Sequence, residues 1–261
     1  GALPAAGRSS GRGVTLALID TGVALHHPDL QGRHIERRNV VDSDQAAYET
    51  DLHGTQLAGV MVATVNNALG IAGIAPEAKV LAIKACWHPS DANRRASCNS
   101  FTLAQGLAAA VKGGAQLINL SLGGPSDPLL ARLATAAQDR GISIIGAAPE
   151  PGAPRGFPVD VPGVIEVAMD EQAGAAPQSL RAPGLDILTL SKAGHYDYAS
   201  GSSLAAAQVS AVAALLLQHE PDMRPARLAT LLRTSRGPTG LVNACAALAA
   251  QGRNAACPLS P

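Results

Sequence analysis

Aromatic residues are scarce in this chain of 261 residues, since phenylalanine, tryptophan and tyrosine together make up 2%. Apolar residues nevertheless reach 47%, so the core must be built from aliphatic side chains packed closely around many of the 27 glycines. An apolar content this high also excludes an intrinsically disordered chain. The sequence therefore predicts a folded domain with an aliphatic core.

The chain also lacks an excess of charge, because 20 Lys and Arg residues balance 20 Asp and Glu residues. A neutral chain has no electrostatic footprint for a phosphate backbone or an anionic membrane surface. Uninterrupted apolar runs of about 18 residues, which could span a membrane, are absent. Residues 1–13 lack the charged start and apolar run of a signal peptide. If the protein is exported, we expect that its signal has already been removed. We therefore expect neither a nucleic-acid partner nor a membrane span.

Cysteine is rare, and the four residues fall into two close pairs, Cys86 with Cys98 and Cys245 with Cys257. Neither pair has the C-x-x-C spacing of a zinc or redox site. Four cysteines allow three connectivities, of which local pairing is the simplest. Two local disulfides would indicate an oxidising compartment, and the alternative is four buried free thiols.

Short β-branched runs alternate with longer amphipathic runs rich in alanine and leucine. Strands are expected at residues 14–19, 80–85, 116–120, 142–146 and 164–169. Helices are expected at residues 54–63, 101–113, 128–140, 203–219, 224–233 and 241–250. Strands that are apolar on both faces and alternate with helices predict a three-layer, doubly wound α/β fold, with a mostly parallel sheet covered by helices on both faces. With no repeat and no long linker, we expect a single domain over residues 1–261.

Three chemically active side chains stand where strands end or helices begin. Asp20 follows a predicted strand and precedes Gly22, His53 stands at the start of a predicted helix, and Ser203 begins a long apolar helix. Ligands and catalysts gather at the carboxyl ends of parallel strands. A carboxylate that orients an imidazole, an imidazole that accepts a proton and a hydroxyl that attacks form a nucleophilic triad. Each motif alone is weak, and the order Asp, His, Ser in matching contexts gives the prediction its specificity.

The chain resembles the subtilisin-like serine proteases, or subtilases, from about residue 14 to about residue 250. The segments that carry the resemblance are VTLALIDTGVALHHPDL at 14–30, HGTQLAG at 53–59, LINLSLGGP at 117–125 and GSSLAAAQVS at 201–210. The resemblance implies a serine endopeptidase in which Asp20 orients, His53 is general base and acid, and Ser203 is the nucleophile.

The resemblance extends to substrate binding. It implies that Ser121, Leu122 and Gly123 pair with the backbone of a peptide substrate as an added strand. Gly156 matches the base of the pocket for the residue before the scissile bond, where it would leave room for a large apolar side chain. The Phe157–Pro158 pair resembles the family's cis-proline turn.

A structural calcium site is implied by the same resemblance. Its ligands would be the side chains of Asp29 and Asn67 and the backbone carbonyls of Val65, Leu69 and Ile71. Calcium takes six to eight oxygen ligands, so this set is most of a coordination sphere. The alternative is a metal-free turn rich in asparagine.

One departure from the family pattern concerns the oxyanion hole. Glu150 stands where the family has an asparagine that donates to the oxyanion, and Pro149 replaces the preceding glycine. An ionised glutamate only accepts hydrogen bonds, and loss of this donor in the same family costs roughly 10²–10³ in rate. Glu150 could be protonated and donate, the loop could be rearranged so that backbone donors suffice, or the protein could be impaired or inactive.

The leading hypothesis is a monomeric serine endopeptidase, secreted or periplasmic, that acts on polypeptides and has a pro-segment or protein inhibitor as partner. The alternative is a catalytically silent subtilase fold that binds peptides through residues 121–123. An esterase or lipase is disfavoured, because the chain lacks a G-x-S-x-G motif and has a different order of triad residues.

Overall fold

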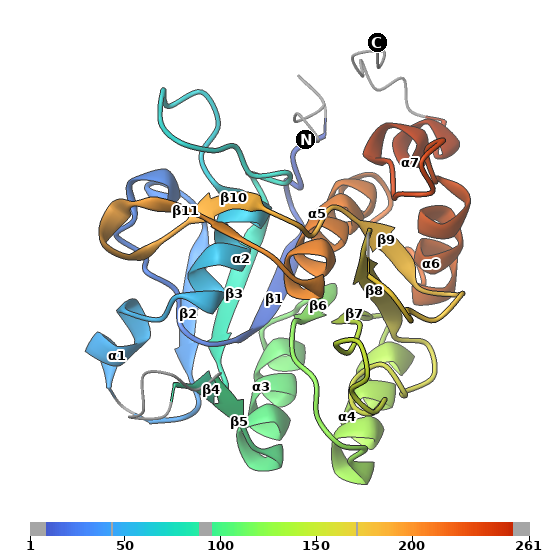
Figure 1. The fold of residues 1–261 in the computed structure, drawn as a ribbon, viewed down its shortest axis with the longest axis horizontal. Helices are drawn as coiled ribbons and strands as arrows, with labels where there is room; N and C mark the ends of the chain where they lie inside the picture. The colour runs from blue at the N-terminus through green and yellow to red at the C-terminus, as the bar shows by residue number, and fades with distance from the viewer. Residues whose placement is uncertain (1–8, 43, 89–95, 171, 253–261) are drawn as a thin grey trace.

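A seven-stranded parallel sheet organises the chain, whose residues 9–42, 44–88, 96–170 and 172–252 are described by a computed structural model (Figure 1). The strand order is β2-β3-β1-β6-β7-β8-β9, and each neighbouring pair runs parallel. Two antiparallel ribbons pair β10 with β11 and β4 with β5. The strands are β1 Thr15–Asp20, β2 Ile35–Asn39, β3 Lys79–Lys84, β4 Cys86–Trp87, β5 Ser97–Cys98, β6 Leu117–Leu120, β7 Ser143–Ala147, β8 Ile165–Met169, β9 Leu180–Ala182, β10 Ile187–Leu190 and β11 Tyr196–Ala199.

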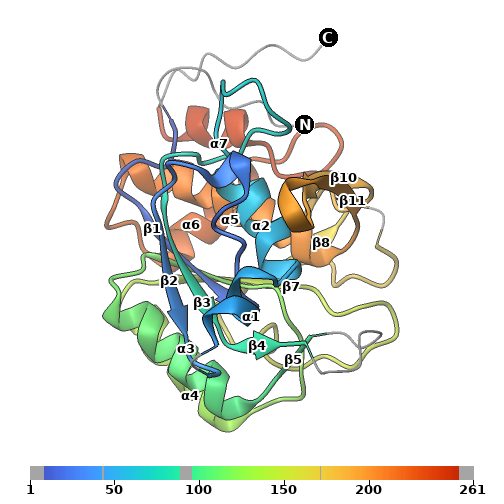
Figure 2. The same ribbon diagram turned by 90° about the vertical axis from the view of Figure 1, so that its left-hand side faces the viewer.

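Helices cover both faces of this sheet (Figures 1 and 2). Helices α2, α5, α6 and α7 pack on one face, and α3 and α4 pack on the other. The predicted three-layer, doubly wound α/β fold is therefore confirmed. The helices are η1 Pro28–Leu30, α1 Gln45–Glu49, α2 His53–Val62, α3 Ser100–Lys112, α4 Pro128–Asp139, η2 Lys192–Gly194, α5 Ser202–His219, α6 Pro225–Thr234 and α7 Ala244–Ala250.

The alternation of side chains along β1 explains why its sequence is apolar throughout. Leu16 and Leu18 join the core on the α2 and α5 side, whereas Ala17 and Ile19 join the core on the α3 and α4 side. Both faces of the strand are therefore buried. The same alternation directs the side chain of Asp20 toward α2 and α5.

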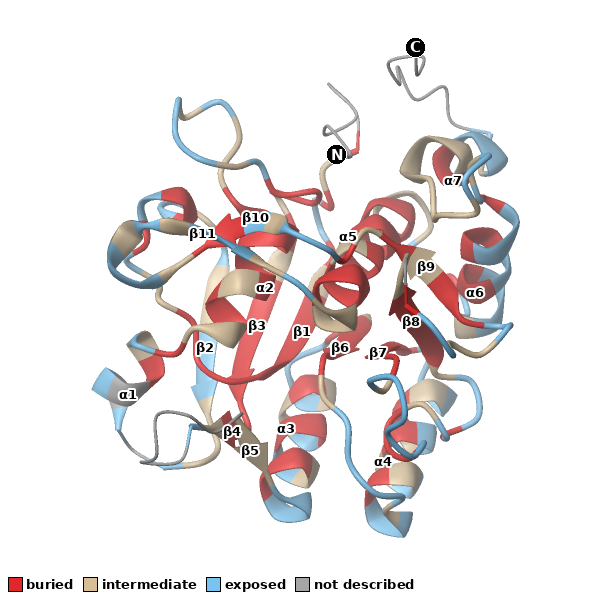
Figure 3. Ribbon diagram, viewed as in Figure 1, coloured by how far each residue is buried: buried red, intermediate tan, exposed pale blue. Residues whose placement is uncertain are grey.

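Helix α5 runs through the core beside β6, β7 and β8, and it is coloured as buried along most of its length in Figure 3. It is apolar and long enough to cross a membrane, but 72% of its 18 residues are buried inside the fold. Many of its buried residues are alanine, which lets the helix lie close to the sheet. Its apolar character therefore reflects its place in the core.

Local signals account for the ends of α4. The Asp127 side chain accepts hydrogen bonds from the backbone N–H groups of Leu129 and Leu130, and proline occupies the first helical position. Past the other end, Gly141 has a φ of 85°, in the left-handed region that favours glycine. The helix expected at 128–140 is confirmed within a residue.

A disulfide joins Cys86 of β4 to Cys98 of β5, which confirms the first predicted pair. Cys257 of the second pair lies outside the described residues. The single-domain organisation stays a prediction.

The strand order reverses next to β1. From β1 the chain first builds β2 and β3 on one side, and it later builds β6 to β9 on the other side. Crevices at such a reversal, beyond the carboxyl ends of the strands, are where open α/β sheets bind ligands. Asp20 ends β1 and Ser121 directly follows β6, so both lie at this point.

Candidate active site

Helix α2 begins against the turn that follows Asp20. A Cβ atom on Gly54 would lie 2.5 Å from the Gly22 carbonyl oxygen and 2.7 Å from that of Thr21, so only glycine permits this approach. The Thr21 hydroxyl accepts a hydrogen bond of 2.9 Å from the Gly54 N–H, and so caps the helix from another segment. These contacts explain the Asp-Thr-Gly and His-Gly motifs as two halves of one junction.

Asp20 and His53 form a hydrogen-bonded pair at this junction. Nδ1 of His53 lies 2.7 Å from Oδ1 of Asp20, and the His53 and Asp20 side chains are 33% and 3% exposed respectively. Burial alone lowers the pKa of His53, but the Asp20 carboxylate more than offsets this through its charge and its hydrogen bond, so the pKa is raised. The imidazole is thus oriented by a buried carboxylate and keeps an edge toward solvent.

Ser203 lies in the first turn of α5 and contacts Ser121, the residue that follows β6. Its hydroxyl donates a long hydrogen bond of 3.4 Å to the Ser121 carbonyl oxygen. No hydrogen bond joins Ser203 to His53 in the part of the chain that the structure describes. The structure therefore pairs Asp20 with His53 directly, while Ser203 is held beside Ser121.

A buried network of polar side chains ends at the Ser203 carbonyl, and the sequence analysis did not predict it. The Ser210 hydroxyl donates to Oδ1 of Asn119 at 2.9 Å, Nδ2 of Asn119 donates to the Ser121 hydroxyl at 2.9 Å, and that hydroxyl donates to the Ser203 carbonyl at 3.1 Å. Asn119 and Ser210 are fully buried. The available signal was a polar residue within an apolar strand, and another within an apolar helix.

A buried ion pair between Lys84 and Asp51 was also missed. Their side chains are 3% and 7% exposed, and Oδ2 of Asp51 also accepts a hydrogen bond of 2.8 Å from the Gly22 N–H. Lys84 is the register partner of Asp20 on the neighbouring strand, so its side chain lies on the same face of the sheet. The pair ties the end of β3 to the segment just before His53.

Glu150 lies in the loop after β7 and is exposed. With its neighbours it lines a cavity of about 150 Å³. Arg155 also lines this cavity. Its Nη1 and Nη2 atoms donate to the buried carboxylate of Glu166 at 3.1 and 2.7 Å. Glu150 therefore stands at the surface, beside this cavity.

The segment predicted to bind substrate, residues 121–123, directly follows β6. Ser121 is buried, Leu122 is half-buried and Gly123 is exposed. Within the described residues, the backbone N–H and carbonyl groups of Leu122 and Gly123 have no hydrogen-bond partner. They are therefore free to pair with another extended chain.

Gly156 lies against the backbone at Gly124, directly after this segment. A Cβ atom on Gly156 would lie 2.1 Å from the Gly124 carbonyl oxygen, so glycine is required by the approach of two backbones. The Gly124 N–H donates to the Phe157 carbonyl at 3.0 Å. The Phe157–Pro158 peptide bond is cis, which confirms that prediction.

Two residues of the predicted calcium site, Asn67 and Ile71, contact Asp29, which is fully buried. Its carboxylate accepts hydrogen bonds from Nδ2 of Asn67 at 2.7 Å and from the Ile71 N–H at 3.0 Å. The loop over residues 65–71 turns back over Asp29, with left-handed backbone at Asn66 and Ala68. Among the described residues, Asp29 has no cationic partner.

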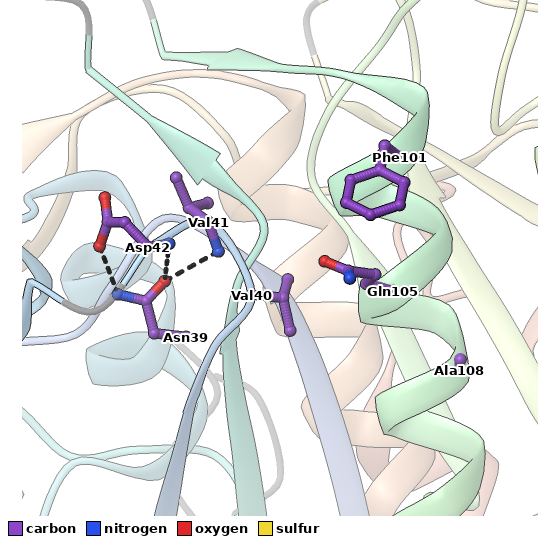
Figure 4. A pocket seen from close by; sticks show the side chains of 7 residues that line it. All are labelled: Asn39, Val40, Val41, Asp42, Phe101, Gln105 and Ala108. Carbon is purple, nitrogen blue, oxygen red and sulfur yellow. Dashed lines mark hydrogen bonds between the residues drawn. The ribbon is translucent and has the colours of Figure 1, made fainter.

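A larger surface hollow, of about 570 Å³, lies between α3 and the segment that follows β2 (Figure 4). Its lining carries none of the predicted site residues that the structure describes, and it holds one carboxylate and no imidazole or hydroxyl nucleophile. The lining residues are Asn39, Val40, Val41, Asp42, Phe101, Gln105 and Ala108. This hollow therefore carries none of the groups of the candidate site among the described residues.

Most of the chain is similar to known proteins of one family. Residues 11–252 match the sequence model described as the subtilase family. The chain is 36% identical over 214 residues to the thermophilic serine proteinase of Bacillus sp. (strain AK1), covering 78% of this chain and 52% of that protein. It is 32% identical over 219 residues to thermitase of Thermoactinomyces vulgaris, covering 80% of this chain and 76% of thermitase. The chain thus spans about half the length of the first relative and about three quarters of the second.

A solved structure extends the likeness to the fold. The chain superposes on fervidolysin from Fervidobacterium pennivorans, described as a keratinolytic enzyme related to subtilisin, with a TM-score of 0.82 and 27% identity. The match covers 92% of this chain and 43% of fervidolysin.

Proposed function

The chain belongs to the subtilase family and carries a subtilisin-like serine peptidase domain, and on that premise we propose that it hydrolyses peptide bonds through Asp20, His53 and Ser203. The observation that carries the proposal is the hydrogen bond between Asp20 and His53 in the crevice where the strand order reverses. A buried carboxylate that orients a partly exposed imidazole is the arrangement that a general base requires.

In the proposed mechanism, Oγ of Ser203 attacks the carbonyl carbon of the scissile peptide while its proton passes to Nε2 of His53. The resulting imidazolium, stabilised by Asp20, gives that proton to the amide nitrogen as the C–N bond breaks. An acyl ester remains on Ser203. Water then attacks the ester, His53 accepts its proton, and the acid leaves as the proton returns to Ser203. For this proton transfer the Ser203 hydroxyl must turn from the Ser121 carbonyl, to which it donates in the structure, toward His53.

Substrate binding is proposed at the segment of Ser121, Leu122 and Gly123. The free backbone groups of Leu122 and Gly123 support pairing with an extended peptide. Main-chain hydrogen bonds of this kind hold a substrate in register without depending on its side chains. The proposed substrate is therefore an unfolded or flexible polypeptide segment.

The oxyanion hole is proposed to be atypical. The exposed position of Glu150 favours an oxyanion held by the Ser203 N–H at the start of α5, where free N–H groups and the helix dipole favour negative charge. The loss of a side-chain donor should then slow the reaction.

Replacement of Ser203 tests the proposed function. Ser203→Ala should abolish hydrolysis of a casein or peptide substrate, and also covalent labelling by a fluorophosphonate probe. Ser191→Ala, a serine away from the crevice, should leave both unchanged. A wild type that takes up no probe, or a Ser203→Ala variant that labels as well as wild type, contradicts the assignment.

A second candidate is a catalytically silent peptide-binding protein. It is favoured by Glu150, which only accepts hydrogen bonds when it is ionised, and by the contact of the Ser203 hydroxyl with Ser121 in place of His53. This candidate predicts that wild type and Ser203→Ala bind a fluorescent peptide equally and that neither labels. Hydrolysis by the wild type excludes it.

A structural calcium ion at Asp29 is a further part of the proposal. A fully buried carboxylate without a cationic partner among the described residues fits a hard cation, and the 65–71 loop folded over it offers backbone oxygens. Asn67 presents its amide nitrogen to Asp29, so ion binding requires its amide to turn and offer the oxygen. The ion would hold this loop against η1 and take no part in the reaction.

Chelation provides the test. With free calcium about 100-fold above Kd, the ion should raise the melting temperature of the Ser203→Ala protein by roughly 5–10 °C relative to excess chelator. Asp29→Asn should remove this difference, whereas Asp139→Asn, an exposed carboxylate on α4, should retain it. Equal melting temperatures with and without chelator contradict the site.

The pairing of two cysteines supports export. The disulfide between Cys86 and Cys98 is stable in an oxidising compartment, so we place the protein outside the cytoplasm, secreted or periplasmic. We also propose that the protein is a monomer. Its proposed partners are a pro-segment or a protein inhibitor that binds at the candidate active site.

A further inference from the structure

Gln172 connects the two segments that frame the oxyanion side of the crevice. The residue is buried, with 4% of its surface exposed. Nε2 donates a hydrogen bond of 2.6 Å to the Pro149 carbonyl, and Oε1 accepts a hydrogen bond from the hydroxyl of Ser202, the residue before the proposed nucleophile. We propose that Gln172 is a positioning residue for the oxyanion hole, an inference that rests on the proposed function.

The amide group suits this position because it both donates and accepts. The Pro149 carbonyl can only accept, and the Ser202 hydroxyl here donates, so a bridge between them needs one donor and one acceptor. Neither a carboxylate nor an ammonium group supplies both. Both bonds are largely shielded from water, where an unmade bond is costly.

The two partners are the segments whose relative position decides oxyanion stabilisation. Ser202 is the first residue of α5, so it fixes where the Ser203 N–H points. Pro149 precedes Glu150 in the loop on the other side. Because Glu150 supplies no donor when ionised, the reaction depends on the placement of the remaining backbone donor. Gln172 therefore acts through Ser202 and Pro149 and does not touch the substrate.

The cavity beside Gln172 shows why the loop needs a tether. It measures about 150 Å³, and Gln172, Pro149 and Glu150 are among its lining residues, the rest of which are mostly alanine and glycine. Small side chains leave the loop room to shift toward the cavity. Loss of the Gln172 bond to Pro149 should let this shift occur without unfolding the domain.

The test uses two replacements of similar size. Gln172→Met removes both hydrogen bonds, and Gln172→Glu keeps an acceptor for Ser202 but, when ionised, loses the donor to Pro149. For each variant, kcat and KM are measured with a peptide amide, and inhibition constants are measured for a peptide boronate and a noncovalent peptide. The boronate forms a tetrahedral adduct on Ser203, so its affinity reports the oxyanion hole.

A positioning role predicts that Gln172→Met lowers kcat by roughly 10- to 100-fold and weakens the boronate by a similar factor. KM and the affinity of the noncovalent peptide should change less than about twofold. At pH 8, Gln172→Glu should lower kcat and boronate affinity by nearly the same factors. Ser202→Ala, which breaks the same bridge, should add little to Gln172→Met, because neighbouring sites in one network are not additive.

Active-site titration with a fluorophosphonate separates the possible failures. A wild type that takes up no probe overturns both the proposed function and this inference. A wild type that labels, with Gln172→Met turning over at the wild-type rate per titrated site, overturns only the inference. If the melting temperature of a variant falls while kcat and boronate affinity per titrated site are unchanged, the role of Gln172 is structural. That result also overturns the inference.

Discussion

The Asp20–His53 pair shows how burial and charge compete on one side chain. Burial disfavours the imidazolium and would lower the pKa of His53, whereas the Asp20 carboxylate favours it. The carboxylate prevails, so the folded-state pKa lies above the ordinary value of about 6.5. This raised pKa also makes the pair stabilise the fold fully below about pH 6.5, and that contribution is lost as pH rises through the folded value.

The pH dependence of catalysis follows from this shift. His53 must be neutral to accept the Ser203 proton, so kcat/KM should fall with an apparent pKa above about 6.5 as pH decreases. Asp20→Asn removes the carboxylate charge but leaves His53 buried. The apparent pKa of the fall in kcat/KM should therefore move to lower pH, and the rate should be reduced. Profiles of kcat/KM from pH 5 to 9 test both. If the acidic side of the profile keeps the same apparent pKa in Asp20→Asn, the charge of Asp20 is not the cause of the shift.

The buried pair of Lys84 and Asp51 makes a prediction about stability. Lys84→Met leaves the buried Asp51 carboxylate with the Gly22 N–H as its only partner among the described residues, which should cost about 3–5 kcal/mol. Asp51→Asn in the same chain should recover most of that loss, because the amide oxygen still accepts from Gly22 and no charge remains. Urea unfolding of both variants in the Ser203→Ala background provides the measurement. A single-variant cost below about 1 kcal/mol contradicts the prediction.

Site residues differed in how far sequence could reveal them. Asp20, His53 and Ser203 each lie at a boundary between elements, in a motif with its own local geometry, so the sequence marks them. Gln172 and Lys84 act through partners distant in the chain, and nothing in their neighbouring residues indicates a role. Only the fold brings such partners together.

Elements were predicted well where burial imposes a pattern. Strands β1, β3, β6, β7 and β8 lie in the core and are apolar, and all were expected. Strand β2 was missed because its residues, IERRN, are polar and half exposed at the edge of the sheet. The ribbon of β10 and β11 was missed for a similar reason, since much of it is exposed and it pairs outside the main sheet.

The close approach of Gly156 to the backbone of Gly124, after β6, leads to a prediction about stability. Gly156→Ala places a methyl group against the Gly124 carbonyl, so one backbone must move, at a cost of about 1–3 kcal/mol. The matched control is Gly124→Ala, where a Cβ atom meets nothing within 4 Å and the backbone is not left-handed. Unfolding midpoints of the two variants test this. Equal stabilities contradict a role for Gly156 in backbone approach.

At the scale of the whole molecule, composition and periodicity predicted the layers but not the order of the strands. Runs that are apolar on both faces require helices on both faces of a sheet. Which strand lies beside which depends on the crossovers, and several orders satisfy the same apolar pattern. The crevice between β1 and β6 is a product of that order, so its position could come only from resemblance or from the structure.

Two apolar cores share one sheet, and this should make the molecule unfold as a unit. The core under α2 and α5 and the core under α3 and α4 both rest on β1, β3, β6 and β7, through alternate residues of the same strands. Loss of either helix layer would expose the strands that support the other, so neither core should persist alone. Scanning calorimetry of the Ser203→Ala protein, which prevents self-digestion, should therefore give one transition with equal calorimetric and van't Hoff enthalpies. Two resolved transitions would contradict the single-domain prediction, and limited proteolysis between them would identify the layer that melts first.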